Sequence, residues 1–159
     1  MWEAIIILSI FVLGVAWALV QINKAPKVMS FREAMDLTEL PVVTFRIDDK
    51  RVNFLLDTGA NASIIDEKAV ALLPHKLSEE KGTVMGIEGV EKDAQCVDME
   101  LSYKDLNYIE TFRVLDMSGV FDAIKQESGV IVNGILGNAF FTKYRYVLDF
   151  KDLIAYSKK

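Results

Sequence analysis

Asp57 is the residue of this sequence best placed to do chemistry. It follows the apolar run FLL at 54–56 and precedes Thr58 and Gly59, so a carboxylate leaves a strand and enters a turn. A carboxylate can activate water as a general base, and a carboxylic acid can donate a proton to a carbonyl. Asp-Thr-Gly also occurs in ordinary turns, so the surrounding elements must decide between these interpretations.

Metal and nucleophile chemistry find little support. The chain has one histidine, His75, and one cysteine, Cys96, and neither lies in an HExxH, CxxC or Ser/His/Asp pattern. We interpret His75 as a surface or capping residue and Cys96 as a half-buried strand residue. A metal-dependent hydrolase using Asp57, Asp66 and His75 remains an alternative, without a recognisable ligand spacing. We predict no metal and no cofactor.

The charge of the chain argues against a nucleic-acid partner. Its formal net charge is −5, and its lysines are scattered rather than gathered in a stripe. A protein that binds phosphate backbones needs a basic surface. With 159 residues, the chain is long enough for one well-buried domain but not comfortably for two.

The N-terminal segment has the character of a membrane anchor. Residues 4–23 carry no charge, and about 20 apolar residues suffice for a helix to cross a bilayer. Trp2 and Trp17 lie near the two ends, where aromatic rings favour the interface. We therefore expect a transmembrane anchor over 3–23.

Two other interpretations of this segment fit its residues less well. A buried core helix would rarely be apolar on every face. A cleaved signal peptide would use the A-x-A site at 16–18, but Glu3 stands where positive charge is expected. Lys24, Lys27 and Arg32 follow the span, so the positive-inside rule predicts a single-pass protein with its C-terminal domain in the cytoplasm.

The residues after the anchor predict a linker and then a hairpin. Ser30 and Glu33 have the spacing of a capping box, so a short helix to about Leu37 is expected within a juxtamembrane linker at 24–39. Pro41 ends it. Strands are expected at 42–47 and 51–56, joined by a short turn. Asp57 then lies at the end of the second strand of the hairpin.

The remaining chain also has a mostly β pattern. A glycine-punctuated stretch at 82–89 precedes strands expected near 94–103 and 108–115. Ser118 is expected to cap a helix to about Glu127, with Gly129 at its exit. The last elements are expected to be an apolar run at 130–132, a turn at 133–138, a short helix and a strand at 146–150.

Several of these segments together resemble the retropepsin-like aspartic proteases. FLLDTGA resembles the family's active-site segment, LPVVTF at 40–45 its first strand, and ILG at 135–137 its second glycine motif. VMGIEG at 84–89 lies where the family has its flap. The resemblance covers roughly 40–156 and implies a protease domain over 40–157. The fold it implies is a mostly β half-barrel with one or two short helices, here preceded by the transmembrane helix.

The resemblance also implies roles for particular residues. Asp57 would be the catalytic carboxylate, Thr58 would lock two active-site loops together, and Gly59 would let backbone and substrate come close. The substrate would be an extended peptide. Residues expected to reach it are Ala60 and, in the flap, Met85, Gly86 and Ile87.

A protease of this kind needs a second carboxylate, and the chain does not offer one. Asp66 is too near Asp57 along the chain, Asp116 stands in D-M-S-G rather than D-S-G, and no glycine follows Asp149. Two close carboxylates share one proton and titrate as a unit. We therefore expect a homodimer in which Asp57 of each chain forms the pair, assisted by membrane confinement.

Two further expectations concern activity. Ala60 has no hydroxyl to stabilise an ionised carboxylate, so we expect activity at weakly acidic to neutral pH. A non-catalytic module remains the main alternative: the same fold used as a membrane-tethered dimerisation or peptide-binding domain.

Overall fold

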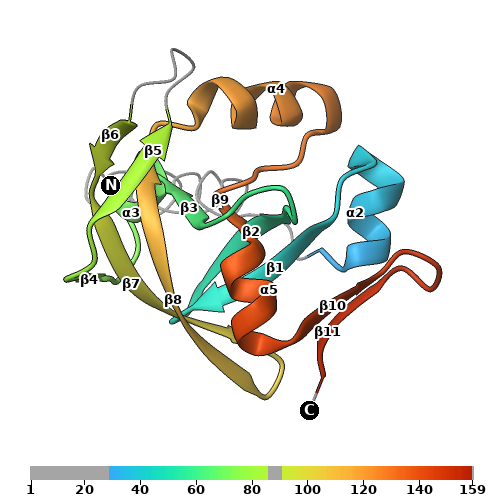
Figure 1. The fold of residues 1–159 in the computed structure, drawn as a ribbon. Coiled ribbons are helices and arrows are strands. Elements are labelled where there is room, and N and C mark those ends of the chain that lie inside the picture. Colours follow the sequence, from blue (N-terminus) through green and yellow to red (C-terminus); the bar gives the residue numbers. More distant parts are fainter. Residues whose placement is uncertain (1–28, 86–90, 159) are drawn as a thin grey trace, which may run out of the picture.

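The computed structural model of the chain describes residues 29–85 and 91–158 (Figure 1). The expected anchor at 3–23, the linker up to residue 28, and Gly86 and Ile87 of the expected flap lie outside the described residues. In the described part of the chain, no helix is both long and apolar enough to cross a bilayer.

A barrel of strands forms the centre of the fold. Hydrogen-bonded neighbours follow the order β1-β2-β9-β3-β8-β7-β4, and an additional pairing between β1 and β7 closes the sheet on itself. The pairs β2–β9 and β3–β8 are parallel, whereas the other pairs are antiparallel. The strands are β1 (Val42–Ile47), β2 (Lys50–Leu56), β3 (Ser63–Asp66), β4 (Lys76–Leu77), β7 (Cys96–Tyr103), β8 (Leu106–Leu115) and β9 (Gly134–Leu136).

The predicted hairpin is confirmed. β1 and β2 pair in antiparallel register from Val42 opposite Leu55 to Ile47 opposite Lys50. Asp48 takes a positive φ of 52° in the turn, a conformation that Asp tolerates better than most residues. The strand ends at Leu56, so Asp57 is the first residue beyond it.

Four helices are described: one in the expected linker, and three in the expected domain at 40–157, where one or two were expected. They are α2 (Phe31–Thr38), α3 (Glu67–Val70), α4 (Ser118–Ser128) and α5 (Asn138–Tyr144). Ser30 caps α2 as predicted, because its side chain accepts from the backbone N–H of Glu33. The sequence did not predict α3, because four residues are too few to display a helical period.

The predicted cap of α4 is wrong, while its predicted end is confirmed. Met117 occupies the N-cap position, and Ser118 is the first helical residue. The Ser118 hydroxyl donates instead to Asp116, whose side chain makes a local turn before the helix. Gly129 ends α4 in the left-handed conformation with φ 74°, which glycine adopts at little cost.

Two small antiparallel sheets flank the barrel. One pairs β5 (Gly82–Met85) with β6 (Glu91–Ala94), and the other pairs β10 (Tyr146–Asp149) with β11 (Ile154–Ser157). In Figure 1 the β10–β11 hairpin lies beside α2, and the aromatic rings of Phe31 and Phe150 meet edge to face. No strand was expected at the position of β11.

The turn expected at 133–138 is also corrected. Residues 134–136 form β9, every residue of which is buried between β2 and β3. A Cβ on Gly134 would lie 2.6 Å from the carbonyl oxygen of Ile64 and 2.8 Å from the ring of Phe54. The glycine that suggested a turn is therefore needed for close packing inside a central strand.

Two apolar clusters make up the core. The larger one fills the barrel and includes several aromatic residues: Tyr108 and Phe112 are buried, and Tyr103 and Tyr144 pack against this cluster. Burial raises the pKa of Tyr146, whose hydroxyl has no hydrogen-bond partner among the described residues. The second cluster joins α2 and α4 to the strands through Met29, Ala34, Val42, Phe121, Val130, Val132 and Ile135.

A buried polar network fixes the point where the chain enters the fold. The backbone N–H of Met29 donates to Thr44 Oγ1 at 2.6 Å, and that hydroxyl donates to Asn53 Oδ1 at 2.6 Å. Asn53 Nδ2 donates in turn to the carbonyl of Ile131 at 2.8 Å. Because Thr44 and Asn53 are buried, these bonds hold the first described residues firmly to the barrel.

Candidate active site

Asp57 lies at the junction of two segments that are distant in sequence. β2 runs parallel to β9, with Leu56 opposite Leu136. The backbone N–H of Asp57 donates to the carbonyl of Leu136 at 3.0 Å, one step beyond the paired strands. The start of the Asp57 loop, which we define as residues 57–62, is thus fixed by the end of β9.

The carboxylate of Asp57 is held by its own loop. Its Oδ1 accepts from the backbone N–H of Gly59 at 2.8 Å. A Cβ on Gly59 would lie 3.2 Å from that oxygen, which is closer than most Cβ contacts in proteins. Thr58 and Gly59 are exposed and Asp57 is partly so. The side chain is therefore oriented and still reachable from solvent.

The far end of the Asp57 loop is bound to the start of α5. The backbone N–H of Asn138 donates to the carbonyl of Ala60 at 2.7 Å, and that of Ala139 donates to the carbonyl of Asn61 at 3.3 Å. A Cβ on Gly137 would lie 2.5 Å from the carbonyl oxygen of Ala62. The two segments therefore touch through their backbones, and only glycine fits at 137.

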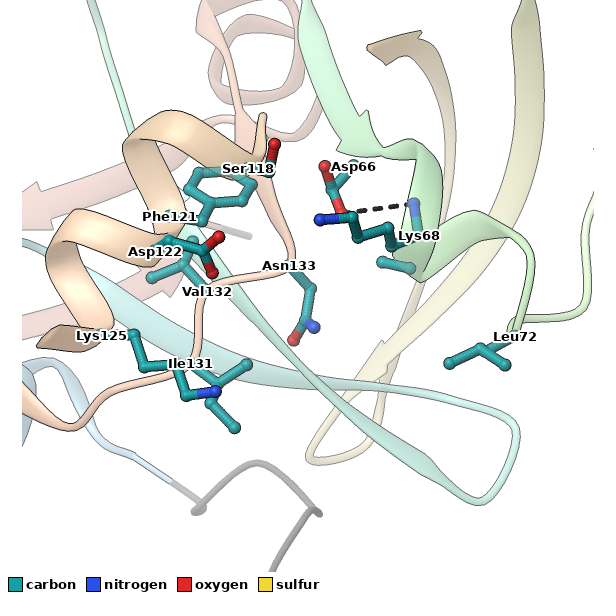
Figure 2. A pocket seen from close by; sticks show the side chains of 11 residues that line it. Asp66, Lys68, Leu72, Ser118, Phe121, Asp122, Lys125, Ile131, Val132 and Asn133 are labelled. Atoms are coloured by element: carbon teal, nitrogen blue, oxygen red, sulfur yellow. Dashed lines mark hydrogen bonds between the residues drawn. The ribbon is translucent and has the colours of Figure 1, made fainter. Parts of the chain in front are cut away.

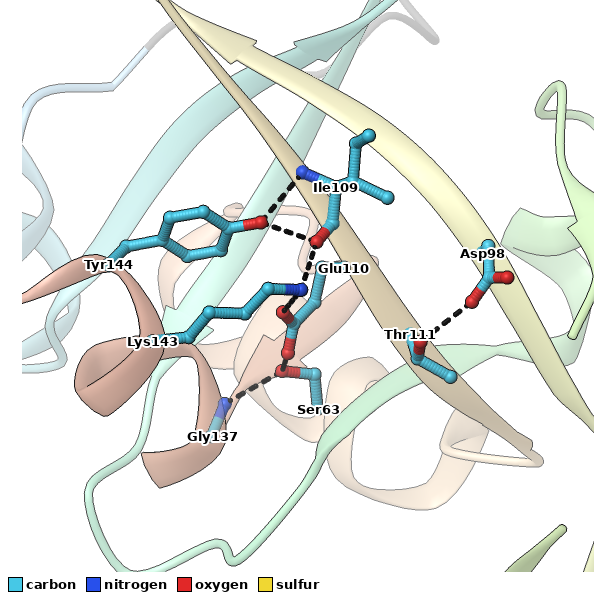
Figure 3. Close-up of polar contacts among 8 residues, drawn as sticks. All are labelled: Ser63, Asp98, Ile109, Glu110, Thr111, Gly137, Lys143 and Tyr144. Atoms are coloured by element: carbon cyan, nitrogen blue, oxygen red, sulfur yellow. Dashed lines mark hydrogen bonds and ion pairs between the residues drawn. The ribbon is translucent and has the colours of Figure 1, made fainter. Parts of the chain in front are cut away.

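A chain of polar side chains supports the contact between the Asp57 loop and the start of α5 (Figure 3). Ser63 Oγ accepts from the backbone N–H of Gly137 at 3.2 Å and donates to Glu110 Oε1 at 2.7 Å. Lys143 Nζ lies 3.9 Å from Glu110 Oε2. Burial raises the pKa of Glu110, and the Ser63 hydrogen bond and the Lys143 charge oppose this rise only in part.

Sequence reasoning missed Glu110, although a signal was present. In YIETF at 108–112 the apolar residues Tyr108 and Phe112 face the core, and Glu110 stands at the same register between them. A charged residue on the inward face of a strand needs a partner, and this requirement marks it as unusual.

The comparisons with known proteins agree with this arrangement. A family model described as "Aspartyl protease" matches residues 43–140, well over half of the chain. The chain belongs to the aspartyl protease family. None of the curated proteins matches it.

A solved structure of the family's type also matches. The structure of EIAV protease complexed with the inhibitor HBY-793 is 21% identical, with a TM-score of 0.49, over 68% of this chain and 90% of that one. In this chain, the segment that the family model matches runs from β1 into α5 and so contains the whole Asp57 loop and Gly137.

The other candidate carboxylates of this chain are engaged elsewhere. Figure 2 shows Asp66 at the start of α3: its Oδ2 accepts from the backbone N–H of Lys68 at 3.2 Å, and its Oδ1 accepts from that of Met117 at 2.9 Å. Asp116 accepts from Ser118. Asp149 accepts from the backbone N–H groups of the turn between β10 and β11. Each therefore accepts from backbone N–H groups outside the Asp57 loop.

The metal-site alternative has no geometric support in the described residues. Within 29–85 and 91–158, no three or more His, Cys, Asp and Glu side chains gather as a metal site would require. His75 is exposed, and its Nδ1 contacts the carbonyl of Leu73 at 2.9 Å. Cys96 is buried as the first residue of β7. Both residues therefore have local structural roles.

The expected flap is described only at its base. β5 and β6 form a hairpin whose register runs from Gly82 opposite Ala94 to Met85 opposite Glu91. Met85 is thus the last residue of β5, and Gly86 and Ile87 lie beyond the described residues. A Cβ on Gly82 would lie 2.7 Å from Cys96 Sγ, so this glycine packs the base of the hairpin against β7.

Proposed function

We propose that the protein is an aspartic endopeptidase that hydrolyses extended peptides as a homodimer. The observation that carries the proposal is the Asp57 loop itself. An oriented, reachable carboxylate stands at the end of β2, and its loop is fastened at both ends to the segment 136–139. Membership of the aspartyl protease family supports the same chemistry.

The proposed mechanism assigns two roles to a pair of Asp57 residues. One carboxylate, ionised, takes a proton from water as the water attacks the scissile carbonyl. The other, protonated, donates its proton to the carbonyl oxygen. The first carboxylate then gives the proton it took from water to the peptide nitrogen as the C–N bond breaks, and a hydroxyl of the tetrahedral intermediate returns a proton to the second carboxylate. Thr58 and Gly59 are exposed beside the carboxylate and would meet the same residues of the second chain.

The homodimer is proposed because one chain supplies one suitable carboxylate. Asp66, Asp116 and Asp149 are each committed to backbone N–H groups in other turns. A two-fold axis beside the Asp57 loop would bring two identical carboxylates together. Ala60 and Met85, with Gly86 and Ile87 of the flap, are proposed to contact the peptide.

The test compares three forms of the full chain: wild type, Asp57→Asn and Asp116→Asn. In Asp57→Asn the new amide retains an oxygen for the Gly59 N–H, so the loop is kept while the acid–base function is lost. Asp116 is the matched control because it begins the similar D-M-S-G segment. The forms are incubated with a peptide mixture across pH, the products are read by mass spectrometry, and the mass in solution is measured by sedimentation.

We expect dimers in all three forms, with cleavage by the wild type and Asp116→Asn only. Cleavage by Asp57→Asn at the wild-type rate would refute the proposal. Dimers that never cleave would favour a peptide-binding or dimerisation module. A monomer that cleaves would refute the shared pair of Asp57 residues.

We further propose that residues 3–23 anchor a protease domain at 40–157 to a membrane, with the domain in the cytoplasm. The support is the uncharged run at 4–23 and the basic residues that follow it. The full chain should remain in the membrane pellet after alkaline carbonate extraction. Release into the supernatant would contradict the anchor, and digestion by protease added outside sealed cells would contradict the orientation.

A further inference from the structure

We propose that Glu110 is a positioning residue for the Asp57 loop. It acts through Ser63 and Gly137, and the inference rests on the proposed protease function. Glu110 lies on β8, outside the Asp57 loop and outside the segment 136–139 that fastens it.

The first step is the orientation of the Ser63 hydroxyl. A hydroxyl has one proton to donate and two lone pairs to accept with. Its proton is committed to Glu110 Oε1 at 2.7 Å, which leaves a lone pair for the backbone N–H of Gly137 at 3.2 Å. Ser63 is 1% exposed and Glu110 4%, so water cannot easily replace either partner.

The second step links Gly137 to the Asp57 loop. An added Cβ at Gly137 would lie 2.5 Å from the carbonyl oxygen of Ala62 and 2.8 Å from that of Ala60. The next residue, Asn138, donates to the same Ala60 carbonyl. A displacement of Gly137 would therefore move the loop directly, because close-packed backbones cannot absorb it.

The charges around Glu110 set how this support responds to pH. Lys143 of α5 approaches Oε2 to 3.9 Å, while Glu80, from the segment before β5, acts in the opposite sense. Lys81 and Arg113 line the same hollow of about 240 Å³. Because burial raises the pKa of Glu110, this carboxyl gains its proton at a higher pH than an exposed glutamate.

Protonation would change the direction of the hydrogen bond. A protonated Glu110 can donate to Ser63, whose own proton then needs another acceptor. The hydroxyl would rotate to reach that acceptor, and the lone pair now aimed at the Gly137 N–H would turn away with it. The Asp57 loop would accordingly be best supported when Glu110 is ionised, and support would decline as the pH falls.

The test uses the full chain as wild type, Glu110→Leu, Glu110→Gln and Asp98→Asn. Leucine removes the acceptor, whereas glutamine keeps an oxygen acceptor without ionising. Asp98 is the matched control, since it accepts from Thr111, the neighbour of Glu110 on β8, in a separate pair (Figure 3). The readouts are kcat and KM across pH, hydrogen exchange of the Gly137 and Asn138 amides, and thermal unfolding.

We expect Glu110→Leu to lower kcat about 10-fold with KM within about 2-fold, because a small displacement at the reacting groups costs that much. Exchange of the Gly137 amide should rise about 10-fold relative to Asp98→Asn, since its acceptor is no longer held. Glu110→Gln should recover most of the kcat and lose the part of the acid decline that Glu110 contributes.

Failure of the positioning role and failure of the protease proposal give different results. If Glu110→Leu matches Asp98→Asn in kcat and in amide exchange, the positioning role is overturned. If the wild type shows no Asp57-dependent cleavage but Glu110→Leu still loosens the Gly137 amide, the protease proposal fails and the positioning of the loop stands.

Discussion

The backbone N–H of Asp57 donates to the carbonyl oxygen of Leu136 at 3.0 Å. This bond extends the parallel pairing of β2 with β9, which joins an early strand to one near the end of the chain. Parallel strands need a long connection, and here it includes the β5–β6 hairpin, β7, β8 and α4. The geometry of the Asp57 loop therefore depends on a contact between two segments that lie far apart in the sequence.

The first prediction concerns Gly137. Gly137→Ala should destabilise the fold by about 3 kcal/mol or more, because its Cβ would overlap the backbone of 60–62. Gly119→Ala is the control: it lies in α4 with nothing within 4 Å of an added Cβ, and should stabilise by about 0.5–1 kcal/mol. Chemical denaturation measures both changes, and equal effects would contradict the close backbone contact.

A second prediction concerns two buried tyrosines. The Tyr146 hydroxyl is buried with no partner among the described residues, so Tyr146→Phe should be neutral or stabilise by about 1 kcal/mol. Tyr108→Phe removes a hydroxyl that bonds Ser157 Oγ at 2.9 Å, and should destabilise by about 1 kcal/mol. Calorimetric unfolding should rank the variants in this order; the reverse order would mean that Tyr146 has a partner.

The third prediction addresses the pH of activity. Ala60→Ser places a hydroxyl in the Asp57 loop, where it can stabilise an ionised carboxylate. The pH of maximal kcat/KM should fall by about 0.5–1 unit, since an anion stabilised by one added hydrogen bond persists at lower pH. Ala62→Ser, in the same loop, is the control with an unchanged optimum. A shift upward in Ala60→Ser would contradict the expectation.

The fourth prediction uses the raised pKa of Glu110. Because the folded-state pKa lies above the unfolded value, this residue favours folding most when protonated, and that contribution is lost as pH rises through the folded pKa. Glutamine stays neutral at every pH. The free energy of unfolding of Glu110→Gln, relative to that of the wild type, should therefore increase as the pH rises from acidic to neutral. If the free energy of unfolding of the variant instead decreases relative to that of the wild type over this range, the Ser63 and Lys143 interactions outweigh burial.

The sequence predicted the elements that carry their own local signals. The β-rich runs at 42–47 and 51–56 predicted the hairpin and so placed Asp57 at a strand end. Ser30 and Gly129 mark helix ends through backbone chemistry that needs no distant partner. The motifs around Asp57 and at 135–137 sufficed to indicate the family.

The elements that were predicted wrongly depend on distant partners. β9 has three residues, too few to show a strand period, and its glycine is typical of a turn. Its place between β2 and β3 is set by those distant strands. Ser118 is the exception: its hydroxyl donates to Asp116, only two residues away, and the sequence pattern did not distinguish this bond from a helix cap. Ser63 meets Glu110 only when β3 lies beside β8, in a register that sets Ser63 opposite Phe112.

The buried position of Met29 limits how far the domain could lie from a membrane. Its backbone N–H donates to the buried Thr44 of β1, so Met29 is fixed to the domain. If residue 23 ends a membrane helix, the connection to Met29 spans at most about 20 Å. A linker that short would hold the Asp57 loop close to the bilayer. Only peptides near the lipid surface could then reach it, whatever the shape of the binding pocket.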